Sequence, residues 1–280
     1  MKRTILVLLL TAFVIFCAKA QNGHFISSDN FSSSLISEMC QDYDGSVWIG
    51  TDYGLNRFDG YRFQTFLHDD TDSTSLQVNV IVTLMVDNKG RLWVGTNRGL
   101  DRFEASTETF IHYPFPTGIH PRVASILQRK DGTIVVGTAG YGIYTVNDED
   151  KLVIYNADLS ERYFNRLYED SKGRVWKTGY DDVIVMREGN KLTRFKSEVG
   201  NPQSIVEYNG ELFFLGLHGL MSYRDGKMSV ADVDLSIASS TDAIFDNAIL
   251  GESGYIYRYA RRWPLSSSPF RYSPSGACRN

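Results

Sequence analysis

The feature that most constrains the fold of this chain is a segment that recurs along it. Residues 45–63 read GSVWIGTDYGLNRFDGYRF, and residues 90–110 read GRLWVGTNRGLDRFEASTETF, with a Trp, a Gly-Thr and a Gly-Leu in the same register. Weaker copies follow at intervals of about 35 to 45 residues. The six units are centred near Trp48, Trp93, Val135, Trp176, Phe214 and Ile249. A period near 40 residues, with four strand-like runs in each unit, is typical of the blades of a β-propeller.

Each unit reads as four short antiparallel strands. No stretch keeps a helical periodicity, and short β-branched or aromatic runs alternate with Asp-Gly and Asn-Gly turns, which is an all-β pattern. Val80–Val86 is apolar on both faces, as expected of the innermost strand of a blade. Asp59-Gly60 is predicted to form a two-residue hairpin turn. The strands of the first unit are expected at Ser34–Cys40, Val47–Thr51, Leu55–Phe58 and Tyr61–Phe66.

The repeated Trp and Gly residues are predicted to have structural roles. A Trp in the second strand fills the space between adjacent blades, where a large flat side chain buries much area. The Gly two residues after it allows a neighbouring element to approach closely. A further Gly is expected to take a positive φ angle in the turn between the second and third strands. These turn glycines are Gly54, Gly99, Gly142 and Gly219, and Asp182 takes the same place in the fourth unit.

Residues 1–20 are expected to be a signal peptide that is not part of the fold. A basic N-terminus precedes an apolar run, Ile5–Phe16, which is short for a membrane span, and Ala18-Lys19-Ala20 fits a cleavage site. The protein is therefore expected to be exported and periplasmic. A lipoprotein attached through Cys17 and an uncleaved anchor are the alternatives. The chain is thus divided into a signal peptide (1–20), a propeller (21–260) and an irregular tail (261–280).

Charge and cysteine content exclude several classes of partner. Three of the 29 basic residues lie in the predicted signal peptide, which leaves 26 basic against 33 acidic residues, and this negative balance disfavours nucleic acid. Cys40 and Cys278 are too few for a disulfide framework, and Cys40 reads as a buried apolar residue. The acidic stretch HDDTDSTS (68–75) lacks the Gly and the distal Glu of a calcium loop. No metal or cofactor is expected.

The repeat resembles a known family. The segments VWIGTDYGLNRFD (47–59) and LWVGTNRGLDRF (92–103), each after a D-x-x-G turn, look like the two-component regulator propeller repeat. The resemblance covers about residues 25–230 and is strongest in the first two units. It implies the extracytoplasmic sensor region of a hybrid two-component histidine kinase of gut Bacteroidota. In that family seven blades close each propeller, and the ligands are generally oligosaccharides.

The chain departs from the plan that this family implies. About six blades are expected here, so the propeller would be an incomplete seven-bladed ring, and a truncated or frameshifted gene is the favoured explanation. No kinase motif and no second apolar span follow, so membrane attachment and kinase activity would need further segments downstream. Phe25-Ile26-Ser27 reads as the outer strand that would close the ring. If its partner blade is missing, the open sheet edge favours self-association.

One face of the predicted propeller varies among the units and is the expected ligand face. It carries the turns between second and third strands and the connections between blades, of which LHDDTDSTSLQ (67–77) and HYPFPTGIHP (112–121) are long. Tyr side chains can stack on a sugar ring, and Asp, Asn and Arg can bind hydroxyls or carboxylates. The candidate oligosaccharide-binding residues are Asp52, Tyr53, Asn97, Arg98, Tyr141, Tyr180, Asp181 and His218.

The sequence therefore favours a sensor propeller that binds an oligosaccharide and is not an enzyme. The alternative is a self-standing exported propeller that acts as a lectin or as a protein-interaction scaffold. A propeller glycosidase or lyase would need paired carboxylates near the axis. The apolar inner strands offer Glu38 and few other candidates for that role.

Overall fold

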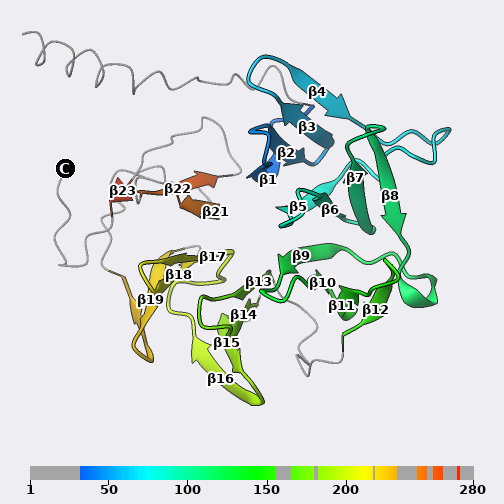
Figure 1. Ribbon diagram of the computed structural model, residues 1–280. Helices are drawn as coiled ribbons and strands as arrows, with labels where there is room; N and C mark the ends of the chain where they lie inside the picture. Colours follow the sequence, from blue (N-terminus) through cyan, green and yellow to red (C-terminus); the bar gives the residue numbers. More distant parts are fainter. Residues whose placement is uncertain are drawn as a thin grey trace, which may run out of the picture. The chain divides into compact units, whose positions relative to one another are not determined.

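The computed structural model is all-β and describes residues 32–155, 165–179, 182–216 and 218–231, together with the backbone of three later strands (Figure 1). The predicted signal peptide, the strand expected at residues 25–27 and two candidate site residues, Tyr180 and Asp181, lie outside the described residues.

Within the described residues, five four-stranded antiparallel sheets follow one another, each built from four consecutive strands. The first contains β1 (Ile36–Gln41), β2 (Val47–Thr51), β3 (Gly54–Phe58) and β4 (Phe63–Phe66). The second contains β5 (Ile81–Val86), β6 (Leu92–Thr96), β7 (Leu100–Glu104) and β8 (Thr109–Tyr113). The third contains β9 (Val123–Gln128), β10 (Ile134–Thr138), β11 (Gly142–Val146) and β12 (Leu152–Ile154).

The fourth sheet contains β13 (Arg166–Glu169), β14 (Val175–Thr178), β15 (Val183–Glu188) and β16 (Lys191–Lys196). The fifth contains β17 (Ser204–Tyr208), β18 (Glu211–Gly216), β19 (Gly219–Arg224) and β20 (Lys227–Val230). The third sheet is preceded by one turn of 3-10 helix, η2 (Pro116–Gly118). This succession of sheets is the β-propeller architecture that the repeat predicts.

A sixth sheet has three strands, β21 (Phe245–Leu250), β22 (Tyr255–Ala260) and β23 (Phe270–Arg271). Ile249 lies in the first strand of this sheet, whereas the Trp positions of the other units lie in second strands. The repeat therefore predicts the sixth unit one strand out of register. β23 falls within the stretch expected to be an irregular tail, and its pairing with β22 corrects that expectation at Phe270 and Arg271.

The loop between β3 and β4 also differs from its prediction. Phe58 pairs with Phe63, so residues 59–62 form a four-residue loop and not a two-residue Asp-Gly turn. The Asp59 carboxylate accepts the backbone N–H groups of Tyr61 and Arg62, each at 2.8 Å. This side-chain cap stabilises the longer loop, because Asp readily bonds backbone amides two and three residues ahead.

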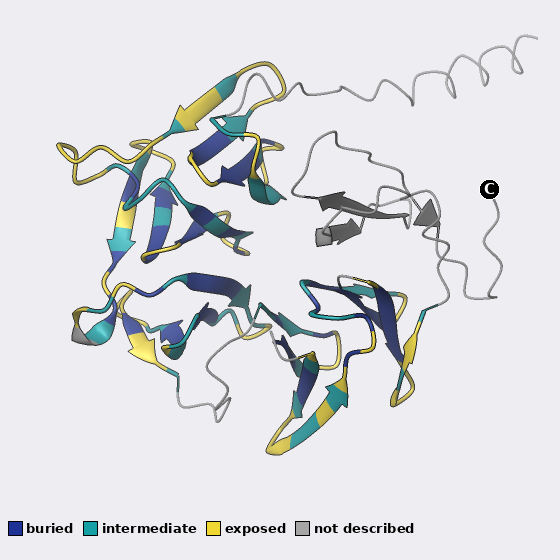
Figure 2. Ribbon diagram, turned by 180° about the vertical axis from the view of Figure 1, so that it is seen from behind, coloured by how far each residue is buried: buried dark blue, intermediate teal, exposed yellow. Residues whose placement is uncertain are grey.

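The core lies between successive sheets. The first strands of neighbouring sheets contact one another from β1 through β5, β9 and β13 to β17. Figure 2 shows the buried residues concentrated in the inner strands, whereas the fourth strands β4, β12, β16 and β20 are largely exposed. Trp48 packs with Leu84 and Phe103 of the second sheet, and Trp176 packs with Phe214 of the fifth. The Trp therefore fills the space between blades, as predicted.

Gly95 confirms the prediction of close approach. A Cβ atom at this position would lie 2.5 Å from Thr83 Cγ2 and 2.7 Å from Val123 Cγ1, so a side chain would collide with two neighbouring strands. Any larger residue would separate the second and third sheets.

The D-x-x-G turn and the Trp are joined by a hydrogen bond that recurs in three sheets. The indole N–H donates to the carboxylate six residues earlier, and that Asp also closes its own turn by accepting backbone N–H groups. The pairs are Trp48–Asp42 at 2.7 Å, Trp93–Asp87 at 2.9 Å and Trp176–Asp170 at 2.7 Å. Asp87 is fully buried and also accepts the N–H groups of Lys89 and Arg91 and the Arg91 guanidinium.

Asp and Trp are present or absent together. In the third sheet Val135 stands in the Trp position and Arg129 in the Asp position. In the fifth sheet Phe214 pairs with Ile205, and Glu207, two residues further, stands where the Asp would be. Without an indole N–H to satisfy, a buried carboxylate would have no compensating partner. For Asp87 and Asp170, burial favours a raised pKa, but the hydrogen bonds from Trp and Arg outweigh it and lower the pKa of both carboxyls.

A second recurring contact ties the sheets together at the D-x-x-G turns. In three sheets a side chain at or next to the end of the first strand accepts a backbone N–H from the turn of the preceding sheet, at 2.7 Å in every case. The strands are β9, β13 and β17. The pairs are Gln128 with Asn88, Glu169 with Lys130, and Glu207 with Ser171. The face that carries these turns is therefore engaged in holding the blades together.

Replacing Asp87 by Ala is expected to lower the free energy of unfolding by about 3 kcal/mol, because the Trp93 indole and two backbone N–H groups lose their acceptor. Asp131→Ala is the matched control, since Asp131 is exposed and caps the turn of the third sheet through the N–H of Thr133. It should cost under about 1 kcal/mol. Urea unfolding of both variants measures the difference, and equal losses would contradict the role assigned to Asp87.

Candidate functional site

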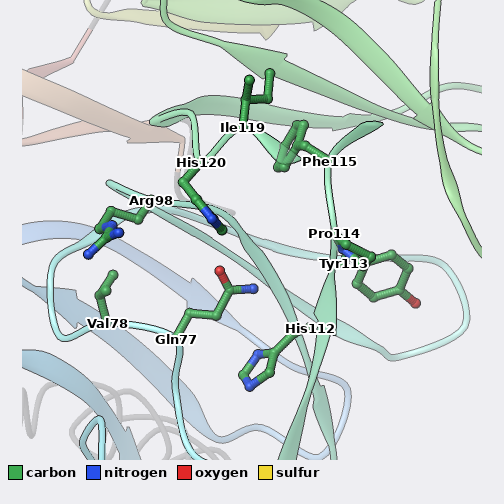
Figure 3. Close-up of a pocket in the computed structure, with 9 residues that line it drawn as sticks. All are labelled: Gln77, Val78, Arg98, His112, Tyr113, Pro114, Phe115, Ile119 and His120. Atoms are coloured by element: carbon green, nitrogen blue, oxygen red, sulfur yellow. The ribbon is translucent and has the colours of Figure 1, made fainter. Parts of the chain in front are cut away.

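A cavity of about 510 Å³ lies beside the second sheet (Figure 3). Its walls come from three segments, which are the connection between β4 and β5, the turn between β6 and β7, and the end of β8 with the connection to β9. The lining residues are Gln77, Val78, Arg98, His112, Tyr113, Pro114, Phe115, Ile119 and His120. The volume is within the usual range for small-molecule sites.

The cavity lies on the face expected to bind a ligand. The backbone N–H of Gly54, in the β2–β3 turn, donates to the carbonyl of Asn79 at 2.7 Å, and the N–H of Asn97, in the β6–β7 turn, donates to Val80 at 3.1 Å. The turns between second and third strands therefore pack on the connections between blades. These two classes of loop form one surface, as the strand order requires.

The apolar wall of the cavity is held rigidly. The ring of Phe115 is buried and meets Tyr144 edge-on, with centroids 4.9 Å apart and an interplanar angle of 88°. Tyr113 is buried, and its hydroxyl donates to Asp150 at 2.8 Å, so in Figure 3 the hydroxyl points away from Arg98 and His120. The cavity thus has a fixed aromatic wall against which an apolar ligand face can rest.

One buried carboxylate organises the polar side. Asp101 is fully buried and accepts the backbone N–H of Gln77 at 3.0 Å, while its other oxygen lies 2.8 Å from Nδ1 of His112. Nε2 of His112 lies 2.9 Å from the carbonyl of Ser73. Both ring nitrogens therefore face acceptors. Only the protonated imidazolium can donate a hydrogen bond from each nitrogen at once. The pair fixes the β4–β5 connection to the second sheet.

His68, at the start of the same connection, repeats this arrangement. Its Nδ1 lies 2.6 Å from the carbonyl of Leu76, and its Nε2 lies 3.0 Å from a carboxylate oxygen of Asp70. Hydrogen bonds to these acceptors raise the pKa of His68. The hydrogen bond to Asp101 likewise raises the pKa of His112, although burial acts in the opposite direction.

Gln77, Arg98 and His120 form the polar rim of the cavity (Figure 3). None of the ion pairs found in the described part of the chain involves Arg98. Gln77 lies over the backbone of Gly99, where a Cβ atom would be 2.3 Å from its Oε1. Gly99 does not take the positive φ angle predicted for it, unlike Gly54 and Gly142. Its lack of a side chain makes room for Gln77 instead.

The described members of the predicted site are spread over the face expected to bind a ligand. Arg98 lines the cavity, and Tyr53 and Tyr141 are about half exposed in the β2–β3 and β10–β11 turns. Asp52, Asn97 and His218 are exposed in their turns but do not line this cavity. Asp182 takes the predicted left-handed conformation, with φ of 53°.

Sequence reasoning missed most of the residues that line the cavity. Gln77 ends the long connection at 67–77, while His112, Phe115 and His120 belong to the stretch at 112–121. The length of both stretches points to this face, but nothing in their sequences marks which side chains converge. The length of the two connections was the signal in the sequence, and residues near their ends line the cavity.

The acidic stretch forms a second, more open cavity of about 710 Å³ with the outer strands of the first two sheets. Its carboxylates cap their own turns: Asp69 accepts the N–H and hydroxyl of Thr71, and Asp72 accepts those of Thr74. Within the described residues no three His, Cys, Asp or Glu side chains gather as metal ligands would. The acids are explained by loop structure.

Glu38 has a structural role at the inner strands. One oxygen lies 2.8 Å from the guanidinium of Arg166 on β13, and the other accepts the N–H of Leu84 on β5 at 3.0 Å. The side chain thus joins three sheets. A carboxylate committed to a cation and a backbone amide is poorly suited to act as a general acid.

Comparison with known proteins supports the resemblance seen in the repeat. Residues 30–53 and 75–98 match the family described as two component regulator propeller. A 73-residue stretch is 37% identical to histidine kinase P4 of Formosa agariphila, which is 24% of this chain and 5% of that kinase.

Solved structures share the fold at low sequence identity. The extracellular domain of a hybrid two component system from B. thetaiotaomicron superposes with a TM-score of 0.57 at 16% identity, over 88% of this chain and 42% of that one. Virginiamycin B lyase from Staphylococcus aureus superposes with a TM-score of 0.63 at 16% identity, over 81% of this chain and 78% of the lyase. Among the described residues, no helix has the length and apolar character needed to cross a membrane.

The two histidines, His68 and His112, are expected to make the β4–β5 connection sensitive to pH. Because the pKa of each is raised on folding, their contribution to stability is full below the unfolded value of about 6.5 and is lost as the pH rises through the folded value. Hydrogen exchange at the Gln77 amide is therefore expected to accelerate above about pH 6.5, beyond the intrinsic increase with pH.

His112→Gln should remove most of this extra dependence, and His68→Gln should reduce it. Exchange at a strand amide remote from the connection, such as that of Val185, provides the internal reference for the intrinsic increase. Identical pH profiles for the Gln77 and Val185 amides would contradict the assignment of His112 as a doubly bonded cation.

Proposed function

We propose that this chain, which carries two copies of the two component regulator propeller repeat, is the exported, periplasmic ligand-sensing domain of a hybrid two-component system and that it binds an oligosaccharide without chemistry. The repeat, and the fold shared with the extracellular domain of a hybrid two component system, support the sensor role. The ligand class and the site are proposals built on the chemistry of the described face.

The cavity beside the second sheet is the observation that carries this proposal. It combines a fixed apolar wall at Phe115 with amide, guanidinium and imidazole groups at Gln77, Arg98 and His120. Sugar rings present an apolar C–H face and a rim of hydroxyls, and this combination of surfaces matches both. Exposed Tyr53 and Tyr141, in neighbouring turns of the same face, extend the surface for a longer chain.

The contacts of Glu38 support binding without catalysis. This carboxylate is paired with Arg166 and with the backbone of β5, so it joins sheets and is not available to a substrate. The likeness to virginiamycin B lyase is one of fold at 16% identity, and a fold hosts many functions.

Binding to a panel of neutral and acidic oligosaccharides, followed by calorimetry and by the rise in melting temperature, tests the proposal. A ligand at one hundred times its Kd should stabilise the protein by about 2.7 kcal/mol. Tyr53→Ala and His120→Ala are expected to weaken binding severalfold, because both lie on the proposed face.

Tyr61→Ala is the matched control. Tyr61 is 93% exposed in the β3–β4 loop, at the opposite end of the first sheet from Tyr53, and its removal should leave affinity unchanged. A panel without any binder, or an equal effect at Tyr61 and Tyr53, would rule out the proposed face.

A further inference from the structure

We propose that the cavity beside the second sheet selects an acidic sugar, with a carboxylate or sulfate group held by Arg98 and His120. This inference rests on the proposed function and assigns the ligand class of the same site. Three observations support it. The lining holds basic groups and no carboxylate, Arg98 takes part in no ion pair among the described residues, and the backbone of Gln77 is fixed by Asp101.

The cavity is lined by basic side chains and by no carboxylate. Arg98, His112 and His120 are among its nine lining residues, and no Asp or Glu is. The carboxylate behind the wall, Asp101, is fully buried and committed to His112 and to the Gln77 amide, so it offers no free oxygen to the cavity. Both ring nitrogens of His112 are already engaged, so a ligand anion would meet the donors of Arg98 and His120 without a competing carboxylate.

The neighbouring cavity has the opposite character. The connection between β4 and β5 places Asp69, Asp70 and Asp72 in the more open cavity, together with Glu108. The whole chain also has a formal net charge of −4. On a protein of negative net charge, a cavity lined by basic groups is where an anionic group is repelled least. The charge pattern therefore determines where the acidic unit of an oligosaccharide binds.

The chemistry of the rim fits a sugar acid better than a free anion. The Arg98 guanidinium can hold a carboxylate or sulfate with two parallel hydrogen bonds, and His120 adds a further donor. Gln77 can donate to and accept from a hydroxyl, and Phe115 and Ile119 offer an apolar surface to the ring. An inorganic anion would use the first set of contacts and leave the second empty.

Calorimetry with three probes tests the ligand class. Trigalacturonic acid carries carboxylates, its methyl ester has the same sugars without charge, and neocarrabiose sulfate carries a sulfate on neutral sugars. At least one of the two anionic probes is expected to bind about tenfold or more tightly than the methyl ester, with an affinity that falls as salt is added. The preferred anionic probe distinguishes carboxylate from sulfate recognition.

Two substitutions test the residues. Arg98→Gln is expected to lower the affinity for the preferred anionic probe about tenfold or more and to remove its salt dependence, because the charge-assisted bonds are lost. Arg62→Gln is the matched control, since Arg62 is 87% exposed at the opposite face and its loss changes the net charge equally. Gly99→Ala should weaken binding severalfold with little change in the melting temperature, because it displaces the Gln77 carboxamide.

Three outcomes overturn the proposal: no binding of either anionic probe, equal binding of the methyl ester, or unchanged affinity in Arg98→Gln. These outcomes are distinguishable from failure of the proposed function. If neutral oligosaccharides bind and Tyr53→Ala weakens them, the sensor proposal stands while the acidic-sugar inference fails. If no oligosaccharide of any charge binds, both fail.

Discussion

The structure depends on a hydrogen bond between a carboxylate, fully buried at Asp87 and Asp170, and an indole. In three sheets the Asp of the D-x-x-G turn accepts the N–H of the Trp that fills the space to the next sheet. One side chain thus closes the turn, fixes the orientation of the Trp and satisfies the polar atom that the Trp brings into the core. Where the Trp is replaced, as at Val135 and Phe214, the Asp is replaced too. The two residues behave as one unit of the repeat.

This scaffold leaves one face free to vary. The D-x-x-G turns bond to the next sheet through Gln128, Glu169 and Glu207, so that face is constrained by blade packing. The opposite face carries connections whose lengths differ, and the cavity forms where two long ones flank the second sheet. Asp101 and His112 fix one of these connections in place. A buried carboxylate therefore organises both the packing of the sheets, as Asp87 does, and the wall of the cavity, as Asp101 does.

Much of the fold followed from local pattern, and the failures have local causes. Strand β2 was predicted at its observed bounds, and the spacing of the Trp positions placed the second strands of five sheets. The Asp59-Gly60 turn was wrong because the Asp59 side chain caps a longer loop. By analogy with Gly54, the sequence predicts a positive φ at Gly99, which the structure does not show. Gly stands there because a side chain would collide with the carboxamide of Gln77, a residue 22 positions earlier. A contact between distant segments produces no periodic pattern in the sequence.

The sequence by itself determined the all-β class, the repeat and the face on which variable loops gather. These properties follow from alternation, turn chemistry and period, which are local and repeated. Only the tertiary structure decided which variable residues act together, because the cavity joins side chains from three connections that are remote in sequence. It also decided that Asp101 is buried behind His112 and that Glu38 is paired with Arg166, since the partner of a charge is set by packing across sheets and not by its neighbours in the chain.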